Sequence, residues 1–240
     1  LAKGRNHLAQ SVNHPAYCDS ATVLTYTQLF NISQNLAAAL ADKLGVELQR
    51  EQQLVAILLD ADWSELPGIV GTILAGHYYV AFDPLQQTDQ YQTYFSEYPI
   101  RALVTTSRHA LIAKSLAKLS PHEVPILCMD NLPDAPQSYG MPAMNGSSHN
   151  AVYFTSGSTG KPRGVLRSHA GMLHTAYLSS VDLGFVPGDH ITLTMPVALG
   201  MSLTATLGAL LNGVTIHRRN EALTSPRTFY QWLQEDEITI

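Results

Sequence analysis

Residues 151–165 read AVYFTSGSTGKPRGV. The apolar run at 151–154 has the length and the Val, Tyr and Phe content of a buried strand. It leads into residues 155–160, which are only Thr, Ser and Gly. Glycines let the backbone approach a ligand closely, hydroxyls and N–H groups donate hydrogen bonds, and Lys161 and Arg163 add positive charge. This composition indicates a loop that holds a polyphosphate.

The segment does not match the common nucleotide loop, G-x-x-x-x-G-K-[ST], because Pro162 follows Lys161. A proline at that point argues against a helix leaving the loop directly. We therefore expect a strand, a hairpin loop and a return strand at 165–167. The alternative is a Gly/Ser-rich surface hairpin that binds nothing.

Residues 155–164, TSGSTGKPRG, resemble the phosphate-loop signature of the adenylate-forming superfamily. That superfamily includes acyl-CoA synthetases, luciferases and the adenylation domains of nonribosomal peptide synthetases. Arg163 stands where the family usually has lysine, so a planar guanidinium replaces a compact ammonium. The resemblance implies that ATP phosphates are bound by Thr155, Ser156, Gly157, Ser158, Thr159, Gly160, Lys161 and Arg163.

Two further segments carry the resemblance. Residues 74–84, LAGHYYVAFDP, resemble an element of peptide-synthetase adenylation domains, and residues 24–29, LTYTQL, match a Leu-Thr-Tyr-x-x-Leu element. Asp83 lies at a strand end and could be catalytic. Because it precedes Pro84, we favour a turn-forming role.

The pattern of apolar residues predicts an α/β fold with mostly parallel sheets and flanking helices. Under the resemblance, residues 1–240 are a partial N-terminal adenylation domain, with its C-terminal part and small mobile domain absent. Strands are expected at 23–26, 54–59, 78–82, 102–104, 124–129, 151–154, 165–167, 191–195 and 214–217. Helices are expected at 27–44, 66–75, 90–98, from 107, at 168–181, 202–211 and around 229–233.

Local signals refine these helices. We expect Thr27 to cap the first helix and Ser168 to cap the helix at 168–181. For the helix expected at 66–75, Asp60, Asp62 and Ser64 are candidates to cap the N-terminus, and Gly76 is expected to end the helix. In the helix at 168–181, Leu173, Ala176 and Tyr177 are expected to face inward.

Composition excludes several classes of protein. The formal charge of −5 and the 45% hydrophobic content are those of an ordinary globular protein, without general affinity for nucleic acid or membranes. No run approaches the ~20 apolar residues of a membrane span. Cys18 and Cys128 lie far apart, which suits a reducing cytoplasm. The ten histidines lack ligand spacing, so no metal site is expected from side chains within this chain.

The resemblance also implies a substrate pocket formed by His169, Leu199, Gly200, Met201 and Thr204. His169 lies where the family commonly has a histidine near this pocket, and a solvated role next to the helix cap is the alternative. Alignment on residues 209–213 puts Gly200 where peptide synthetases have an aspartate that pairs with the substrate amino group. Without that carboxylate a buried α-ammonium would have no partner. We therefore expect an acid without a free α-amino group.

The implied chemistry is ATP- and Mg²⁺-dependent activation of a carboxylic acid, followed by transfer to the phosphopantetheine thiol of a carrier protein. The alternatives are a free-standing acyl-CoA ligase, which uses coenzyme A, and a nucleotide-binding module without catalysis. The family's Tyr-Gly-x-Thr-Glu element, ribose-binding aspartate and catalytic lysine have no counterpart before Ile240. We expect this fragment alone not to complete the reaction, and no catalytic residue is assigned within it.

Overall fold

The computed structural model describes residues 13–85, 88–134, 140, 142–155, 163–195, 201–219 and 225–240. The chain divides into two compact units. The first comprises Leu1–Leu29, Ala61–Trp63 and Leu173–Ile240, and the second comprises Phe30–Asp60 and Ser64–Met172.

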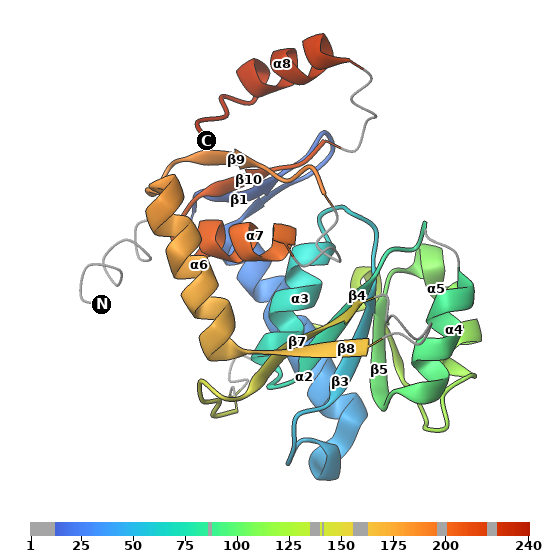
Figure 1. Cartoon of the computed structure of the whole chain (residues 1–240). Coiled ribbons are helices and arrows are strands. Elements are labelled where there is room, and N and C mark those ends of the chain that lie inside the picture. Colours follow the sequence, from blue (N-terminus) through green and yellow to red (C-terminus); the bar gives the residue numbers. More distant parts are fainter. Residues whose placement is uncertain are drawn as a thin grey trace. The chain divides into compact units, whose positions relative to one another are not determined.

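A six-stranded sheet forms the centre of the second unit (Figure 1). Its strand order is β6-β5-β3-β4-β7-β8, and every neighbouring pair is parallel except β7 and β8, which are antiparallel. A strand between two covered faces needs an apolar side chain at every position, and β3 is buried along its whole length. The strands are β3 (Leu54–Leu58), β4 (Tyr78–Phe82), β5 (Ile100–Thr105), β6 (Ile126–Cys128), β7 (His149–Thr155) and β8 (Arg163–Ser168).

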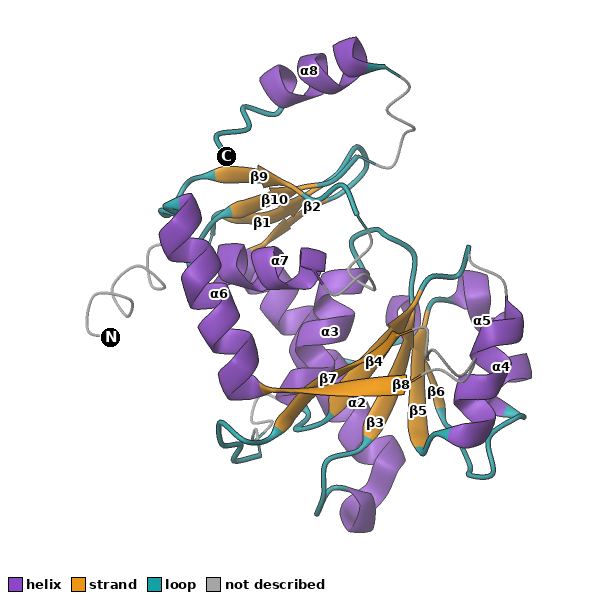
Figure 2. Ribbon diagram, in the orientation of Figure 1, coloured by secondary structure: helices purple, strands orange, loops and turns teal. Residues whose placement is uncertain are grey.

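Helices cover both faces of this sheet (Figure 2). Helices α4 (Thr88–Glu97) and α5 (Ala110–Ala117) pack on the face that carries Leu54, Leu58 and Phe82. Helices α2 (Tyr26–Leu48) and α3 (Glu65–Leu74) belong to the other layer, where a Cβ added at Gly68 would meet Ile57 and Leu59. Short 3₁₀ turns, η1 (Ser107–His109) and η2 (Met129–Asn131), follow β5 and β6. The second unit is therefore a three-layer α/β/α structure.

A four-stranded sheet forms the first unit, in the order β2-β1-β10-β9. Strands β1, β10 and β9 are parallel, and β2 pairs antiparallel with β1. Helix α7 packs on α6, and Asn212 Nδ2 donates to Ser180 Oγ at 2.7 Å. The elements are β1 (Pro15–Cys18), β2 (Val23–Thr25), α6 (His169–Leu183), β9 (His190–Thr192), α7 (Met201–Leu211), β10 (Thr215–His217) and α8 (Pro226–Glu235).

The predicted α/β fold with mostly parallel sheets and flanking helices is confirmed. Two local predictions are wrong: the capping residue of helix α2 and the buried side of helix α6. Helix α2 starts at Tyr26, and Thr25 rather than Thr27 accepts the capping hydrogen bond, at 3.2 Å from the Gln28 N–H. On α6, Leu173 and Tyr177 are 54% and 65% exposed. The buried side of that helix follows Met172 and Ala176, one position away, because it packs closely on α7.

Other local predictions are confirmed. Ser168 Oγ accepts the Gly171 N–H at 3.2 Å and so caps α6. The left-handed glycine expected after α3 is Gly76, with φ of 83°. Asp83 forms the expected turn, since its Oδ1 accepts the Leu85 N–H at 2.9 Å. None of the helices in the described segments is long and apolar enough to cross a bilayer.

Candidate nucleotide-binding site

The β7–β8 hairpin brings together the two ends of the predicted phosphate loop. The register pairs Thr155 with Arg163 and Phe154 with Gly164. This confirms the predicted strand, hairpin and return strand. Six of the predicted phosphate-binding residues, Ser156, Gly157, Ser158, Thr159, Gly160 and Lys161, lie outside the described residues.

Aromatic rings pack against one face of this hairpin. Phe154 stacks on Tyr94 of α4, with ring centroids 3.9 Å apart and an angle of 15° between the planes. Tyr98 meets the same ring edge-on, at 4.6 Å and 66°. A Cβ added at Gly164 would lie only 3.1 Å from Val152 Cγ1 and 3.3 Å from Phe154 Cε1. Glycine at this position therefore lets the return strand lie flat on the aromatic ring.

Polar side chains gather near the opposite face. Tyr79 is 1% exposed, and burial, together with the neighbouring Tyr153 hydroxyl, raises its pKa well above the ordinary value. Burial likewise raises the pKa of Tyr153, and the guanidinium of Arg167 opposes both shifts. Neither phenol oxygen has a hydrogen-bond partner of good geometry. Both tyrosines therefore stay protonated at neutral pH and keep a hydroxyl available for hydrogen bonding.

His169 begins α6 directly after β8. Its N–H donates to the Ser148 carbonyl at 2.9 Å, and its Nδ1 lies 3.4 Å from Asn150 Nδ2. Burial lowers the pKa of His169, so the imidazole is neutral at pH 7. Its Nε2 is buried without a hydrogen-bond partner. The side chain is half-buried, and its role in the substrate pocket stays a prediction.

The predicted substrate-pocket residues other than His169 lie in the first unit's part of the chain. Met201 and Thr204 are in the first turn of α7. Their side chains, and all of Leu199 and Gly200, lie outside the described part of the structure. The pocket thus stays a prediction.

Asp60 does not cap α3. It follows β3 and accepts hydrogen bonds from His109 Nε2 at 2.9 Å and Arg108 Nη1 at 3.2 Å. These contacts join the loop after β3 to the loop after β5, two neighbouring strands of the sheet. Sequence spacing gave no signal for this cluster, because its members are 48 and 49 residues apart.

Metal ligands do not cluster in the part of the chain that the structure describes, where no group of three or more His, Cys, Asp or Glu side chains could hold an ion. Mg²⁺ commonly keeps several waters and binds through substrate phosphates and only one or two protein ligands. The hydroxyl-bearing residues that could supply such a ligand, Ser156, Ser158 and Thr159, lie outside the described residues.

Comparison with known proteins gives the family. The model of the AMP-binding enzyme family matches residues 5–240, and the chain belongs to this family. Surfactin synthase subunit 2 of Bacillus subtilis is 27% identical over 234 residues, which are 91% of this chain and 6% of that protein. The chain spans 3% to 10% of the lengths of the first curated relatives.

Solved structures share the fold. The nonribosomal peptide synthetase FmoA3 bound to α-methyl-L-serine-AMP superposes with a TM-score of 0.82 and 18% identity, over 99% of this chain and 26% of that one. The O-succinylbenzoate coenzyme A synthetase MenE of Bacillus subtilis, in complex with ATP and magnesium, gives a TM-score of 0.79 at 18% identity. That match covers 99% of this chain and 61% of MenE.

Proposed function

We propose that this chain is the N-terminal part of an adenylation domain that activates a carboxylic acid with ATP. In this reaction a carboxylate oxygen bonds to the α-phosphorus of ATP while the bond to pyrophosphate breaks, which yields an acyl-adenylate. One observation carries the proposal: within a chain that matches the AMP-binding family over residues 5–240, TSGSTGKPRG runs from the end of β7 to the start of β8, which pair as antiparallel strands.

The loop residues would bind the β and γ phosphates. N–H groups and hydroxyls from Thr155 to Thr159 donate hydrogen bonds to phosphate oxygens, and Lys161 and Arg163 supply positive charge. Charge that develops on the departing pyrophosphate is stabilised by these fixed donors. Bound Mg²⁺ would neutralise part of the same charge, held by phosphate oxygens with Ser or Thr hydroxyls of the loop.

The second step of the proposed function is transfer of the acyl group to a thiol. Similarity to peptide synthases such as surfactin synthase subunit 2 supports the phosphopantetheine of a carrier protein as the acceptor. The fold shared with a coenzyme A synthetase supports free coenzyme A as the second candidate. We favour the carrier protein because the sequence likeness, rather than the fold alone, points to synthases.

The substrate that fits best is a carboxylic acid without a free α-amino group. The support is the sequence resemblance alone: if residues 209–213 are matched to the corresponding element of peptide synthetases, Gly200 takes the position of their substrate-binding aspartate. Burying an ammonium without a carboxylate partner costs several kcal/mol, on the order of a thousandfold in affinity. Aryl, keto and fatty acids avoid this cost.

Alanine substitution of the loop hydroxyls tests the nucleotide-binding role. Thr155, Ser156 and Thr159 are replaced together in the full-length protein, and acid-dependent exchange of pyrophosphate into ATP is measured. We expect exchange to fall at least about a hundredfold, since each lost charge-assisted hydrogen bond costs about 1.5 kcal/mol or more. Ser115→Ala is the control, because that exposed hydroxyl only donates to Leu111 O within α5. Unchanged exchange in the triple variant would refute the assignment.

A further inference from the structure

Three tyrosines of the α4 region share one side of the helix. Tyr91 and Tyr94 lie within α4, and Tyr98 continues its last turn, with its N–H donating to the Tyr94 carbonyl at 3.0 Å. The spacing of three and four residues puts them on the same helical face. That face packs on the carboxyl ends of β4 and β7, which are neighbouring parallel strands.

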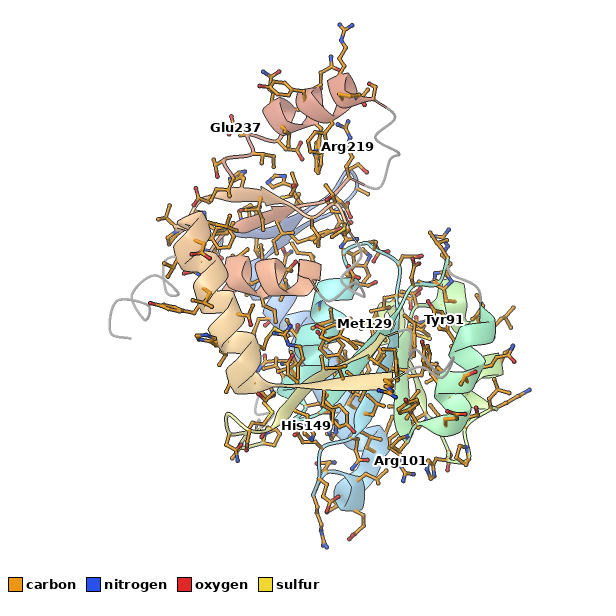
Figure 3. All side chains as sticks on the ribbon, in the orientation of Figure 1. Tyr91, Arg101, Met129, His149, Arg219 and Glu237 are labelled. Atoms are coloured by element: carbon orange, nitrogen blue, oxygen red, sulfur yellow. The ribbon has the colours of Figure 1, made fainter. Side chains whose placement is uncertain are left out.

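Tyr91 holds the end of β4. Its ring packs on Phe82, with centroids 4.6 Å apart. The Tyr91 hydroxyl donates to the Asp83 carbonyl at 2.9 Å and accepts the Asp83 N–H at 3.1 Å. Both hydrogen-bonding groups of the Asp83 backbone are thereby tied to the helix. Figure 3 labels Tyr91 beside α4.

Tyr94 links that strand end to the end of β7. Its ring lies 5.7 Å from Phe82, nearly parallel at 20°, and 3.9 Å from Phe154 at 15°. Tyr98 closes on Phe154 from its edge. Phe154 is followed by Thr155, the last residue of β7 before residues 156–162. Stacked and edge-to-face contacts between aromatic rings stabilise the packing beyond the burial of area.

The return strand is included in the same packing. A Cβ at Gly164 would lie 3.3 Å from Phe154 Cε1 and 3.5 Å from Tyr98 Cε1. The Tyr98 ring therefore lies against both members of the Phe154–Gly164 pair. This pair is next to Thr155–Arg163, the last pair of the two strands. Tyr98 therefore lies against both strand ends that lead into the phosphate loop, and Tyr94 packs on the β7 end through Phe154.

We propose that Tyr91, Tyr94 and Tyr98 form an aromatic brace in which Tyr94 and Tyr98 are positioning residues for ATP. This inference rests on the proposed function of the hairpin loop. The brace holds the two strand ends in the arrangement that the loop needs when it binds phosphates. A loop with loosely held ends must be ordered at the moment of binding, and this ordering weakens affinity.

The test compares ring-removing and ring-keeping variants in the full-length protein. Tyr94→Leu and Tyr98→Leu remove the contacts with Phe154, whereas Tyr94→Phe keeps the stacked ring. The matched control is Phe95→Leu, which removes a fully buried ring of the same helix that packs on Phe82 at 5.8 Å. The readouts are the KM for ATP and kcat in pyrophosphate exchange, with thermal stability measured on each variant.

We expect the KM for ATP to rise about three- to tenfold in both Leu variants, with kcat at saturating ATP within about twofold of the original. Tyr94→Phe, which keeps the stacked ring, should have the same KM for ATP as the unaltered protein. Phe95→Leu should lower the melting temperature but leave the KM unchanged. Equal KM values in the folded Leu variants, or an equal rise in Phe95→Leu, would overturn the brace.

Amide hydrogen exchange separates this inference from the proposed function. If the unaltered full-length protein shows no exchange of pyrophosphate with any acid, the proposed function fails. The brace is then judged by amide protection at 151–155 and 163–166. Faster amide exchange there in Tyr94→Leu, with β3 and β5 unchanged, supports the brace. Unchanged protection at 151–155 and 163–166 overturns it.

Discussion

Thr155 pairs directly with Arg163 at the open end of the β7–β8 hairpin. The seven residues between them include five of the hydroxyl and glycine positions expected to bind phosphate. The pairing places a guanidinium at the start of the return strand, directly opposite the residue where the loop begins. The positive charge where β8 begins is thus contributed by Arg163, at a position where the adenylate-forming superfamily usually has lysine.

Arg163→Gln should raise the KM for ATP about tenfold or more, because a hydrogen bond to a charged group contributes about 1.5–3 kcal/mol. Arg163→Lys keeps the charge and should change KM less. Steady-state pyrophosphate exchange of the full-length protein measures both. If Arg163→Gln matched the unaltered protein, Arg163 would have no role in phosphate binding.

The unfolding free energy should fall as pH falls from 7 to 5. Burial lowers the pKa of His77 from 6.5 to about 4, and it lowers the pKa values of His169 and His217 as well. The unfolded chain then binds more protons than the folded chain, so stability is fully present above pH 6.5 and is lost as pH falls toward 4. From His77 alone the loss by pH 5 is about 2 kcal/mol.

Urea unfolding at pH 7 and pH 5 measures this loss. His77→Gln should flatten the pH dependence, leaving the smaller share of His169 and His217. His122→Gln is the control, since that histidine lies outside the buried set. A folded protein equally stable at both pH values would contradict the assignment of neutral buried histidines.

Gly71→Ala should destabilise the second unit by about 3 kcal/mol, through overpacking between α3 and α2. A Cβ there would lie 2.7 Å from the Ser33 carbonyl oxygen and 2.9 Å from Leu36 Cβ. Gly140→Ala is the matched control, because a Cβ at Gly140 would have nothing within 4 Å. Chemical denaturation compares the two variants. Equal stability would mean that α2 and α3 are not packed as closely as the structure has them.

Asp236→Ala should loosen α8 and lower stability by about 1–3 kcal/mol, since two buried donors lose their acceptor. Asp236 Oδ2 accepts from Trp232 Nε1 at 2.7 Å and from His217 Nδ1 at 3.0 Å. Glu235→Ala is the control, as that exposed carboxylate only lies 3.7 Å from Arg219. Amide exchange of residues 226–235 reports the change. Equal protection in both variants would exclude Asp236 as the anchor.

Sequence patterns predicted the fold well wherever the deciding signal was local. The aliphatic run of β3 and the glycines after α3 and α7 each specify their element through neighbours in the chain. Strand β1 was missed because Pro15 and Ala16 are weak strand formers, and its pairing partner β10 lies about 200 residues away. Ser225 followed by Pro226 is a local signal for the start of α8, where Ser225 and Thr228 form a capping box in the structure.

The phosphate-binding role of the loop stays a prediction from sequence, and the aromatic residues that surround the loop's two ends were not predicted. TSGSTGKPRG identifies itself by composition. The contact of Tyr94 with Phe154 depends on β4 lying beside β7, a neighbour relationship between strands that are far apart in sequence. The regular spacing of Tyr91, Tyr94 and Tyr98 shows that they share a helical face, but sequence does not show which strand ends that face meets.

A screen of pyrophosphate exchange in the full-length protein, across a panel of acids, tests the central claim most directly. The panel contains aryl, keto and fatty acids beside the proteinogenic amino acids, each with ATP and Mg²⁺. We predict exchange that depends on an acid without a free α-amino group and is lost in the Thr155, Ser156 and Thr159 alanine variant. Exchange with amino acids alone would contradict the substrate class, and no exchange with any acid would contradict the proposed function.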